Sequence, residues 1–417
     1  MIKKEKLETL FPLIIFSILL CAQFHSAVFH GGRFMAEEGC IFFEKAWNSS
    51  WSDALFFSYG GYLNIVANAS TLLACHLMPL ADAPYFTMGV SLLLQLCAPW
   101  LVLTAKDAWL ASYRVRLMAV ALLLVVPEWV EVSLHSVHSQ YHLSLCCGLI
   151  LALATEKGWR EHLRRVLLFL APLSGPGGVV MAPLFILRAL VDRTRARVIE
   201  CLVINVASAI QMLLFFHKYQ ERTYDFNFHD YVLVFLTRYV MTPLIGIKPF
   251  ITNIALSIQG MEKAGHTPYF PVGVALALLV LCAGTLVYQA VRNRASHEAA
   301  WLAIAGGTHA LASMYGALGG ASTVLVAGCA QRYVFVGQSL FALSIACLAV
   351  TGTPAIRTLC RYLVAIMLVM GTYHFITPFA KNMLHGPSWR GEVARWEQDH
   401  DAPLHIWPQP EWNMHLR

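Results

Sequence analysis

Charged residues are scarce in this chain of 417 residues: only 13% are Asp, Glu, Lys or Arg, whereas 58% are hydrophobic. A soluble protein needs far more charge to cover its surface, and the mean hydropathy of +0.58 also argues against that class. The apolar residues form repeated runs and lack the polar–apolar alternation of transmembrane β-strands. The sequence therefore predicts an all-α, polytopic transmembrane protein with about eleven membrane-inserted helical elements.

The first apolar run is not expected to be a cleavable leader. Residues 1–6 are basic, and the apolar run that follows, 10–29, is longer than a typical signal-peptide core and has no clear cleavage site. We therefore interpret this run as an anchoring first span. The eleven cysteines do not indicate a disulfide framework, because most lie within apolar runs, where cysteine acts as a small hydrophobic residue.

Lys and Arg are unevenly distributed, and their distribution predicts the topology. Basic loops of short-looped membrane proteins lie in the cytoplasm. The basic clusters are 106–116, 157–165, 188–197, 292–294 and 357–361. With all of them inside, the predicted spans are 10–29, 84–104, 117–127, 142–155, 198–217, 270–290, 299–316, 333–350 and 361–377. The N-terminus is then cytoplasmic and the C-terminal tail is external.

This map divides the chain into two regions. A transmembrane domain, residues 1–377, carries external loops at 30–83, 128–141, 218–269 and 317–332, and the third of these loops contains an apolar stretch at 231–250. Residues 378–417 contain four Trp and several Pro. This tail is too short for its own core, and its Trp residues suit a membrane interface. We expect it to pack on the outer face as a cap.

Two segments differ from simple spans. Residues 166–190 have basic flanks and a Ser-Gly-Pro-Gly-Gly break at 174–178, which predicts a short helical hairpin whose open backbone needs protein or water partners. Residues 58–79 are long enough to cross a bilayer but contain Asn64, Asn68 and His76. We expect a helix along the outer interface. The alternative is a crossing helix, which would place a basic loop outside.

The first candidate site is the acidic pair Glu37-Glu38, which directly follows the first span. Facing bulk water, two adjacent carboxylates would be solvated and without special chemistry. Facing a cavity between helices, desolvation and mutual repulsion would raise one pKa and create a usable base. The residue types alone favour neither interpretation.

The second candidate site is the polar segment from Glu128 to His142. On a helix, His135, His138 and His142 would share one face. A zinc site is conceivable, but no Cys or second cluster completes it and the HExxH pattern is absent, so we assign no metal site. We expect the wall of a substrate cavity instead. The residues assigned to this wall are Glu128, Glu131, His138, Gln140 and His142.

The third candidate site is Gln331-Arg332-Tyr333 at the outer end of the 333–350 span. An Arg at a lipid interface often only extends its charge toward water. An Arg that faces the outer cavity would suit a phosphate group, because its planar fork donates hydrogen bonds in pairs. We assign Arg332 and Tyr333 to substrate binding, with Arg238 and Lys248 as weaker candidates of the same type.

Several short motifs together resemble a known family. These motifs are Glu37-Glu38-Gly39 after the first span, Ser58-Tyr59-Gly60-Gly61-Tyr62-Leu63, the hairpin from Leu173-Ser174-Gly175-Pro176 to Pro183-Leu184, and the tail motifs Gly386-Pro387-Ser388-Trp389, Arg395-Trp396 and Ile406-Trp407-Pro408. The chain resembles the bacterial GT-C-type membrane glycosyltransferases, and more closely their "EDG…GYL" relatives. The likeness spans most of the chain, although each motif is short and degenerate.

The resemblance implies a specific activity. GT-C enzymes transfer a sugar from a polyprenyl-phosphate carrier to an acceptor at the outer face of the bacterial inner membrane. An acidic residue in the first external loop acts as base, and Glu37 matches the first position of that acidic pair, where Asp is usual, while Glu38 matches the second. The family often has Asn and Trp near 139–142, where this chain has Ser-Gln-Tyr-His. That departure puts the roles of Gln140 and His142 in doubt.

The partners implied are a lipid-linked sugar donor, membrane lipid, and an acceptor that is a cell-envelope glycan, a lipid or a protein. Neither a cofactor nor a nucleic-acid partner is expected, and a role for a divalent metal stays open. Two other classes remain. A transporter or lipid flippase would also have many helices and a broken hairpin, although no inverted repeat is evident and the polar groups cluster outside. A non-catalytic scaffold is the third class.

Overall fold

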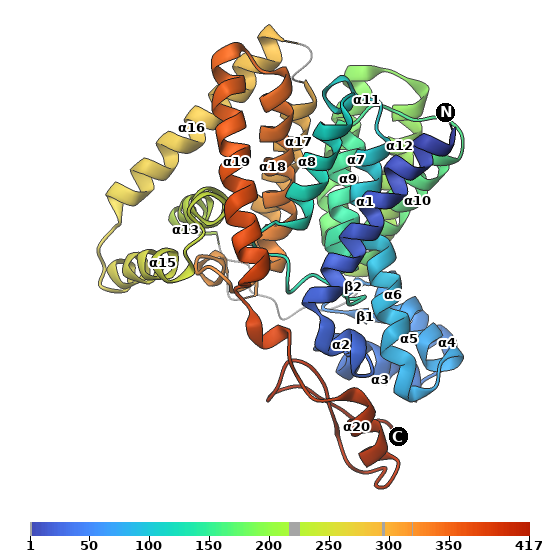
Figure 1. Cartoon of the computed structure of the whole chain (residues 1–417). Coiled ribbons are helices and arrows are strands. Elements are labelled where there is room, and N and C mark those ends of the chain that lie inside the picture. Colours follow the sequence, from blue (N-terminus) through green and yellow to red (C-terminus); the bar gives the residue numbers. More distant parts are fainter. Residues whose placement is uncertain (1, 217–225, 294–296, 319) are drawn as a thin grey trace.

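The computed structural model describes residues 2–216, 226–293, 297–318 and 320–417, and this part of the chain is mostly helical (Figure 1). The predicted all-α fold is confirmed. Strands occur in the described ranges only as two antiparallel hairpins, β1 (Ser58–Tyr59) with β2 (Tyr62–Leu63), and β3 (Leu404–His405) with β4 (Asn413–Met414). Both hairpins lie outside the bundle of long helices.

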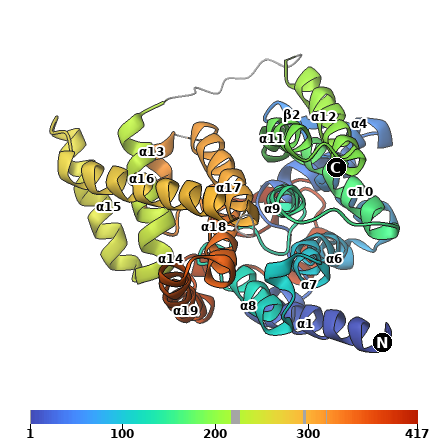
Figure 2. The same ribbon diagram turned by 90° about the horizontal axis from the view of Figure 1, so that it is seen from above.

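Most of the helices pack into one bundle, as two perpendicular views show (Figures 1 and 2). They are α1 (Ile2–Gln23), α6 (Ala83–Gln95), α7 (Cys97–Thr104), α8 (Tyr113–Leu124), α9 (Ser139–Ala152), α10 (Trp159–Ser174), α11 (Pro176–Asp192), α12 (Arg195–Phe216), α16 (Tyr269–Arg292), α17 (His297–Tyr315), α18 (Arg332–Thr351) and α19 (Pro354–Ile376).

The other elements build the connections and the tail. Between α1 and α6 lie α2 (His25–Phe29), the π-helix η1 (Glu38–Phe43), α3 (Glu44–Asn48), α4 (Trp51–Leu55), α5 (Ile65–Leu77) and the 3₁₀-helix η2 (Leu80–Asp82). Between α12 and α16 lie α13 (Phe228–Val234), the π-helix η4 (Phe235–Met241), α14 (Thr242–Ile245) and α15 (Lys248–Lys263). The remaining short helices are η3 (Ala108–Leu110), η6 (Ala321–Val324), η7 (Lys381–Met383) and α20 (Trp389–Trp396).

Six helical segments in the described part are long and apolar enough to cross a membrane. They are 6–23, 80–104, 195–216, 269–292, 332–351 and 354–376. This is fewer than the predicted number of about eleven inserted elements, which stays a prediction. The expected spans at 117–127 and 142–155 correspond to α8 and α9, which have 12 and 14 residues. Each is about 20 Å long, shorter than the ~30 Å hydrocarbon core.

The two central helices of the bundle are α9 and α18. Thirteen of the 14 residues of α9 are buried. The apolar segment of α18 is 83% buried, the highest fraction among the six apolar segments. Gly148 lets the two helices approach closely, because a Cβ there would lie 2.6 Å from a methyl carbon of Leu340. By contrast, only 11% of the apolar segment of α16 is buried inside the structure. The apolar side chains of α16 therefore face outward, as expected for contact with lipid.

The predicted helical hairpin is present as α10 and α11, which meet at Gly175. Its two helices together span 159–192, which is longer than the predicted 166–190. The backbone of Gly178 packs directly against α10, since a Cβ there would meet the Pro172 nitrogen at 2.4 Å. Glycine is therefore required for the tight return of the chain.

Residues 58–79 do not form one continuous helix. They begin with the β1–β2 hairpin, and only Ile65–Leu77 is helical. These 13 residues give a helix of about 20 Å, which is too short to cross a bilayer. A single crossing over 58–79 is excluded, whereas a position along the interface stays a prediction.

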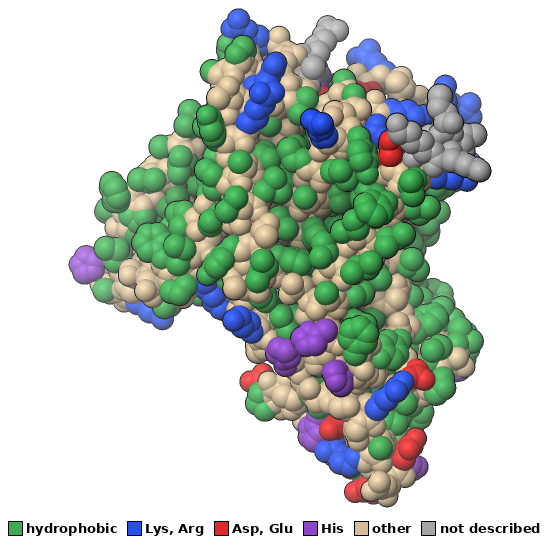
Figure 3. All heavy atoms as spheres, viewed as in Figure 1, with side chains coloured by type: hydrophobic (Ala, Val, Ile, Leu, Met, Phe, Trp, Pro, Cys, Tyr) green, Lys and Arg blue, Asp and Glu red, His purple; other side chains and the backbone are tan. Residues whose placement is uncertain are grey.

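Charge separates the two ends of the bundle. We name as the basic end the connections at 105–112, 153–158, 193–194 and 352–353 with the helix termini beside them, and as the loop end residues 30–82, 125–138, 317–331 and 378–417. Lys and Arg side chains gather at the basic end in the space-filling view (Figure 3). Contacts join this end across the bundle: Lys106 pairs with Glu156 at 3.5 Å, and Arg197 donates to the Leu153 carbonyl at 2.6 Å. The basic clusters thus share one end, as the sequence predicted.

Candidate functional site at the loop end

Glu38, one member of the acidic pair, is fully buried where two loops meet. Its Oε1 accepts hydrogen bonds from the Ser136 backbone N–H at 2.6 Å and from the Ser136 hydroxyl at 2.7 Å. Its Oε2 accepts from the Met35 N–H at 3.4 Å. Burial raises the pKa of Glu38 above its usual range, and the Ser136 hydrogen bonds and nearby Arg33 act in the opposite direction. Glu38 therefore joins the 30–82 loop to the 125–138 loop.

Glu37, its neighbour, has a different environment. It precedes the first residue of η1 and is only half-buried. Its carboxylate makes no hydrogen bond or ion pair with any residue that the structure describes. π-Helical turns such as η1 are frequent at functional sites. Of the two acidic side chains, Glu37 is thus the one whose carboxylate has no partner among the described residues.

Arg33 is a site residue that the sequence interpretation missed. Its buried guanidinium donates to the Ser133 carbonyl and to the Met383 carbonyl, each at 2.8 Å, and stacks on the Phe24 ring at 4.4 Å. Burial lowers the pKa of Arg33 to about 10, and Glu38 partly opposes this shift. The position of Arg33 four residues before the acidic pair was the only available signal.

The 125–138 segment is irregular, and α9 begins only at Ser139. The expectation that His135, His138 and His142 share one helical face is therefore wrong. His135 Nε2 and His138 Nδ1 both lie 2.7 Å from the Glu131 carbonyl oxygen, where they act as donors. Burial lowers the pKa of His138 to about 3 and that of His135 well below its usual value. The lowered pKa values favour neutral rings, and the two hydrogen bonds to the Glu131 carbonyl stabilise the conformation of the 125–138 segment.

His142 and Gln140 lie on α9 and point to different neighbours. His142 Nε2 is 2.9 Å from the Val132 carbonyl, and its ring contacts Phe335. Gln140 packs against the α10–α11 break, because a Cβ on Gly175 would overlap its Oε1 at 1.9 Å. No group of three or more His, Cys, Asp or Glu side chains with metal-binding geometry occurs among the described residues. The structure thus gives these predicted wall residues hydrogen-bonding and packing partners within the protein.

Arg332 forms an ion pair with Glu131 at the start of α18. Arg332 Nη1 contacts Glu131 Oε1, and the Arg332 backbone N–H donates to Glu131 Oε2 at 3.2 Å. The Arg332 side chain is 27% exposed, whereas that of Glu131 is 5% exposed. The guanidinium lies over the ring of Tyr333, 4.8 Å from its centre. Tyr141 lies close enough to interact electrostatically with Arg332, Tyr333 and Tyr62.

A second ion pair joins Glu128 to Arg238, on the π-helix η4. Both side chains are fully buried, and Arg238 Nη2 lies 3.1 Å from Glu128 Oε1. Arg238 also donates to the carbonyls of Val324, Val326 and Cys329. All these partners lie in the loops before α9 and α18, so Arg238 holds the 317–331 loop against the 125–138 loop. Burial raises the pKa of Glu128, and Arg238 opposes this shift.

The structure therefore connects most of the predicted site residues through one segment. Residues 125–138 contact Glu38 through Ser136, Arg33 through Ser133, Arg332 through Glu131, and Arg238 through Glu128. The first loop adds further support, since Asn64 donates to the Val137 carbonyl at 3.0 Å. Segments separated by up to about 350 residues in the chain thus meet at the loop end.

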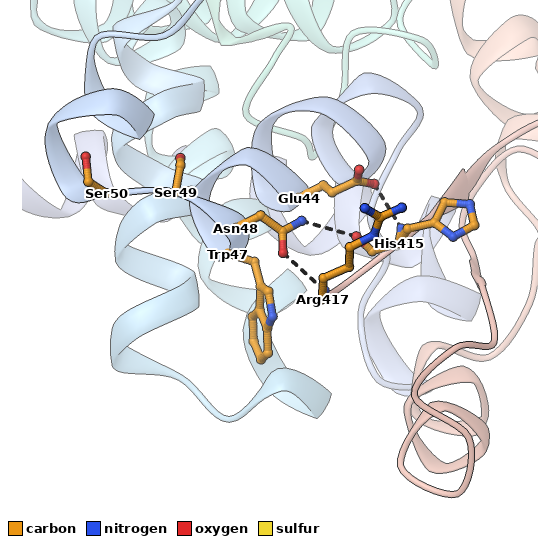
Figure 4. A pocket seen from close by; sticks show the side chains of 7 residues that line it. All are labelled: Glu44, Trp47, Asn48, Ser49, Ser50, His415 and Arg417. Carbon is orange, nitrogen blue, oxygen red and sulfur yellow. Dashed lines mark hydrogen bonds between the residues drawn. The ribbon is translucent and has the colours of Figure 1, made fainter.

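The C-terminal tail packs on the first loop, and its position at the outer face stays a prediction. Trp407 exchanges backbone hydrogen bonds with Phe34 and Ala36, and Phe34 makes an edge contact with the Trp389 ring at 5.0 Å. A surface hollow of about 890 Å³ lies between α3 and the tail (Figure 4). Its lining residues are Glu44, Trp47, Asn48, Ser49, Ser50, His415 and Arg417. None of the predicted site residues borders this hollow.

No protein-family model matches the chain, and a search of curated proteins finds no match. The resemblance to GT-C glycosyltransferases thus depends on the short sequence motifs.

Proposed function

We propose that this protein is a membrane glycosyltransferase that transfers a sugar from a polyprenyl-phosphate donor to an acceptor at the outer face of a bacterial inner membrane. The loop end would then face the periplasm and the basic end the cytoplasm, because Lys and Arg are retained inside. The six apolar segments support a membrane location, and the charge difference between the ends supports this orientation.

The observation that carries the proposal is the environment of Arg332. This guanidinium reaches the surface at the end of an apolar helix, where a lipid headgroup would lie, and two tyrosines, Tyr141 and Tyr333, lie beside it. Arg donates paired, charge-assisted hydrogen bonds to phosphate oxygens. Tyrosine rings offer an apolar face and a hydroxyl, which suit a sugar ring. A cation with aromatic neighbours thus fits a glycosylated lipid phosphate.

The acidic pair would supply the base, with a division of roles between its members. Glu37 has a free carboxylate, whereas Glu38 is held by three hydrogen bonds and positions the loop. The acceptor hydroxyl oxygen forms the new bond to the anomeric carbon as the bond from that carbon to the phosphate oxygen breaks. The leaving phosphate takes the electron pair and is stabilised by Arg332, while the hydroxyl proton passes to Glu37. A single displacement inverts the anomeric centre.

The test is a transfer assay with the purified full chain in nanodiscs. The substrates are a panel of radiolabelled polyprenyl-phosphate hexoses and pentoses, with a cell-envelope extract as acceptor. Glu37→Gln keeps the side-chain shape but cannot take the proton, so transfer is expected to fall by about 10²–10⁴-fold. Arg332→Ala should abolish use of the donor, and Arg332→Lys should restore part of it.

The matched controls are Glu397→Gln and Arg390→Ala, which remove exposed charges in the tail. Both controls should transfer sugar at the wild-type rate. If Glu37→Gln, Glu38→Gln and the double variant all transfer at the wild-type rate, this acidic pair is not the catalytic site. Uptake or flipping of the labelled lipid without sugar transfer would instead support the alternative function, a membrane transporter or lipid flippase.

A further inference from the structure

We infer that Glu131 is a resident competitor for the donor's phosphate: its carboxylate occupies the phosphate position on Arg332, and lipid phosphate binds by displacing it. This inference rests on the proposed function and adds a means of regulating the same site. It separates Glu131 from the other residues of the predicted cavity wall, because Glu131 would oppose binding of the donor.

The contacts of the carboxylate resemble those of a bound anion. One oxygen of Glu131 meets the Arg332 guanidinium, and the other accepts the Arg332 backbone N–H at 3.2 Å. Guanidinium and backbone N–H groups are also the donors that proteins use for phosphate oxygens. A phosphate at Arg332 therefore requires the donors that Glu131 now occupies.

Burial of the pair is uneven, and this leaves a path for a ligand. The Arg332 side chain is 27% exposed while that of Glu131 is 5% exposed, so the cation is open on one side and the carboxylate lies behind it. A guanidinium has five N–H donors. The described contacts of the Arg332 side chain are with Glu131, Tyr333 and Tyr141. A phosphate can therefore approach Arg332 from the exposed side before the ion pair breaks.

The pair between Arg238 and Glu128 shows what a closed arrangement looks like in the same protein. Both of those side chains are fully buried, and Arg238 has three backbone carbonyls as acceptors in addition to Glu128. That pair has no exposed side for a ligand. In the pair between Arg332 and Glu131, by contrast, the cation is partly exposed, and no backbone carbonyl accepts from its guanidinium among the described residues.

Exchange of ligands requires movement of one side chain only. The Glu131 N–H donates to Gln331 Oε1 at 3.1 Å, and the Glu131 carbonyl accepts from His135 and His138. These main-chain contacts do not depend on the carboxylate. The backbone of Glu131 therefore stays fixed when its side chain leaves Arg332, which preserves the loop around the site.

The decisive variant is Glu131→Gln, which removes the negative charge and keeps the shape and the main-chain contacts. The measurement is the affinity of the purified full chain in nanodiscs for a fluorescent polyprenyl phosphate without sugar. We expect Glu131→Gln to bind it about tenfold more tightly than the wild type, equivalent to about 1.4 kcal/mol. Glu131→Asp has a shorter side chain that reaches Arg332 less well, so this variant should bind the polyprenyl phosphate with intermediate affinity. It provides a second test if the Gln variant folds poorly.

Four controls identify the source of the effect. The Asp82→Asn variant removes a carboxylate from the exposed pair with Arg390 and should not change affinity. The gain should disappear in the Glu131→Gln/Arg332→Ala double variant. Polyprenol, which lacks the phosphate, should bind the wild type and Glu131→Gln equally. Competition by inorganic phosphate would identify a free-anion site, whereas resistance to it supports a lipid headgroup.

Two failures are distinguishable. If polyprenyl phosphate binds the wild type in an Arg332-dependent way and Glu131→Gln binds equally or more weakly, Glu131 positions Arg332 and the inference is overturned. If polyprenyl phosphate binds all variants no better than polyprenol, the proposed function itself fails.

Discussion

Arg238 and Glu128 form an ion pair in which both side chains are fully buried, although they are separated by 110 residues in the chain. The shortest contact, from Nη2 to Oε1, is 3.1 Å. Removing one partner of such a pair leaves an uncompensated charge away from water, which is more costly than losing the attraction itself. The pair lies beneath the loops that position the candidate site, so its loss should affect the whole loop end.

The first prediction concerns this pair. Glu128→Gln should lower the free energy of unfolding by about 3–5 kcal/mol, because Arg238 would keep its charge without a carboxylate. Arg238→Met should destabilise at least as strongly, since three backbone carbonyls also lose their donor. The measurement is thermal unfolding in nanodiscs. Asp82→Asn, which breaks the exposed pair with Arg390, is the control and should leave the unfolding midpoint nearly unchanged.

The second prediction separates the two members of the acidic pair by stability. Glu38→Gln presents an amide N–H₂ to Ser136 or Met35, whose groups are donors, and should lower the free energy of unfolding by about 1–3 kcal/mol. Glu37→Gln should leave it unchanged, because the Glu37 carboxylate has no partner among the described residues. Unfolding midpoints of the two variants test this. Equal destabilisation by both substitutions would contradict the division of roles between them.

The third prediction concerns acid. Burial lowers the pKa of His138 to about 3, whereas an unfolded histidine titrates near 6.5. Between these values the unfolded chain binds more protons, so stability is complete above about pH 6.5 and falls as pH decreases toward about 3. His138→Asn keeps a donor for the Glu131 carbonyl and cannot titrate. Unfolding midpoints from pH 7 to pH 4 should therefore fall less steeply in this variant.

A residual slope is expected in His138→Asn because His135, also buried with a lowered pKa, titrates in the same direction. The double variant His135→Asn/His138→Asn should flatten the profile further. An identical slope in wild type and double variant would show that neither ring is buried as the structure places it.

The fourth prediction concerns sidedness. A short epitope inserted at Gly158, which has no neighbour at its Cβ position and lies at the basic end, should be reached only after the inner membrane is permeabilised. An epitope after Arg417 should be reached from the periplasm. Antibody labelling of spheroplasts tests both. Finding the two epitopes on one side would contradict the proposed topology, which places the connection between α9 and α10 inside and the tail outside.

Local patterns predicted the features that depend on local sequence. Apolar runs located most of the long helices, and the Ser-Gly-Pro-Gly-Gly break located the turn between α10 and α11. Clusters of Lys and Arg located the basic end. Each of these signals acts within one turn or one helix, so a single chain is enough to recognise it.

Features that depend on distant partners could not be predicted. Arg33 and Arg238 resemble ordinary interfacial cations in sequence, and their roles come from carbonyls 86 to 350 residues away. The helical face expected for the three histidines failed because their loop is irregular, with Leu134 at a φ of +53°. In this loop the Glu131 carbonyl accepts hydrogen bonds from the His135 and His138 rings. In a helix the same carbonyl would accept from a backbone N–H four residues later.

The backbone pairing of Trp407 with residues 34–36 also fixes an order of assembly. The ribosome releases the first loop about 370 residues before Trp407, which at 5–20 residues per second is an interval of roughly 20–75 s. During this time Phe34 and Phe43 lack the Trp389 and Ile406 side chains that later cover them. A nascent chain arrested before Trp389 would therefore expose an aromatic surface, and this is the stage at which a holdase chaperone would find its target.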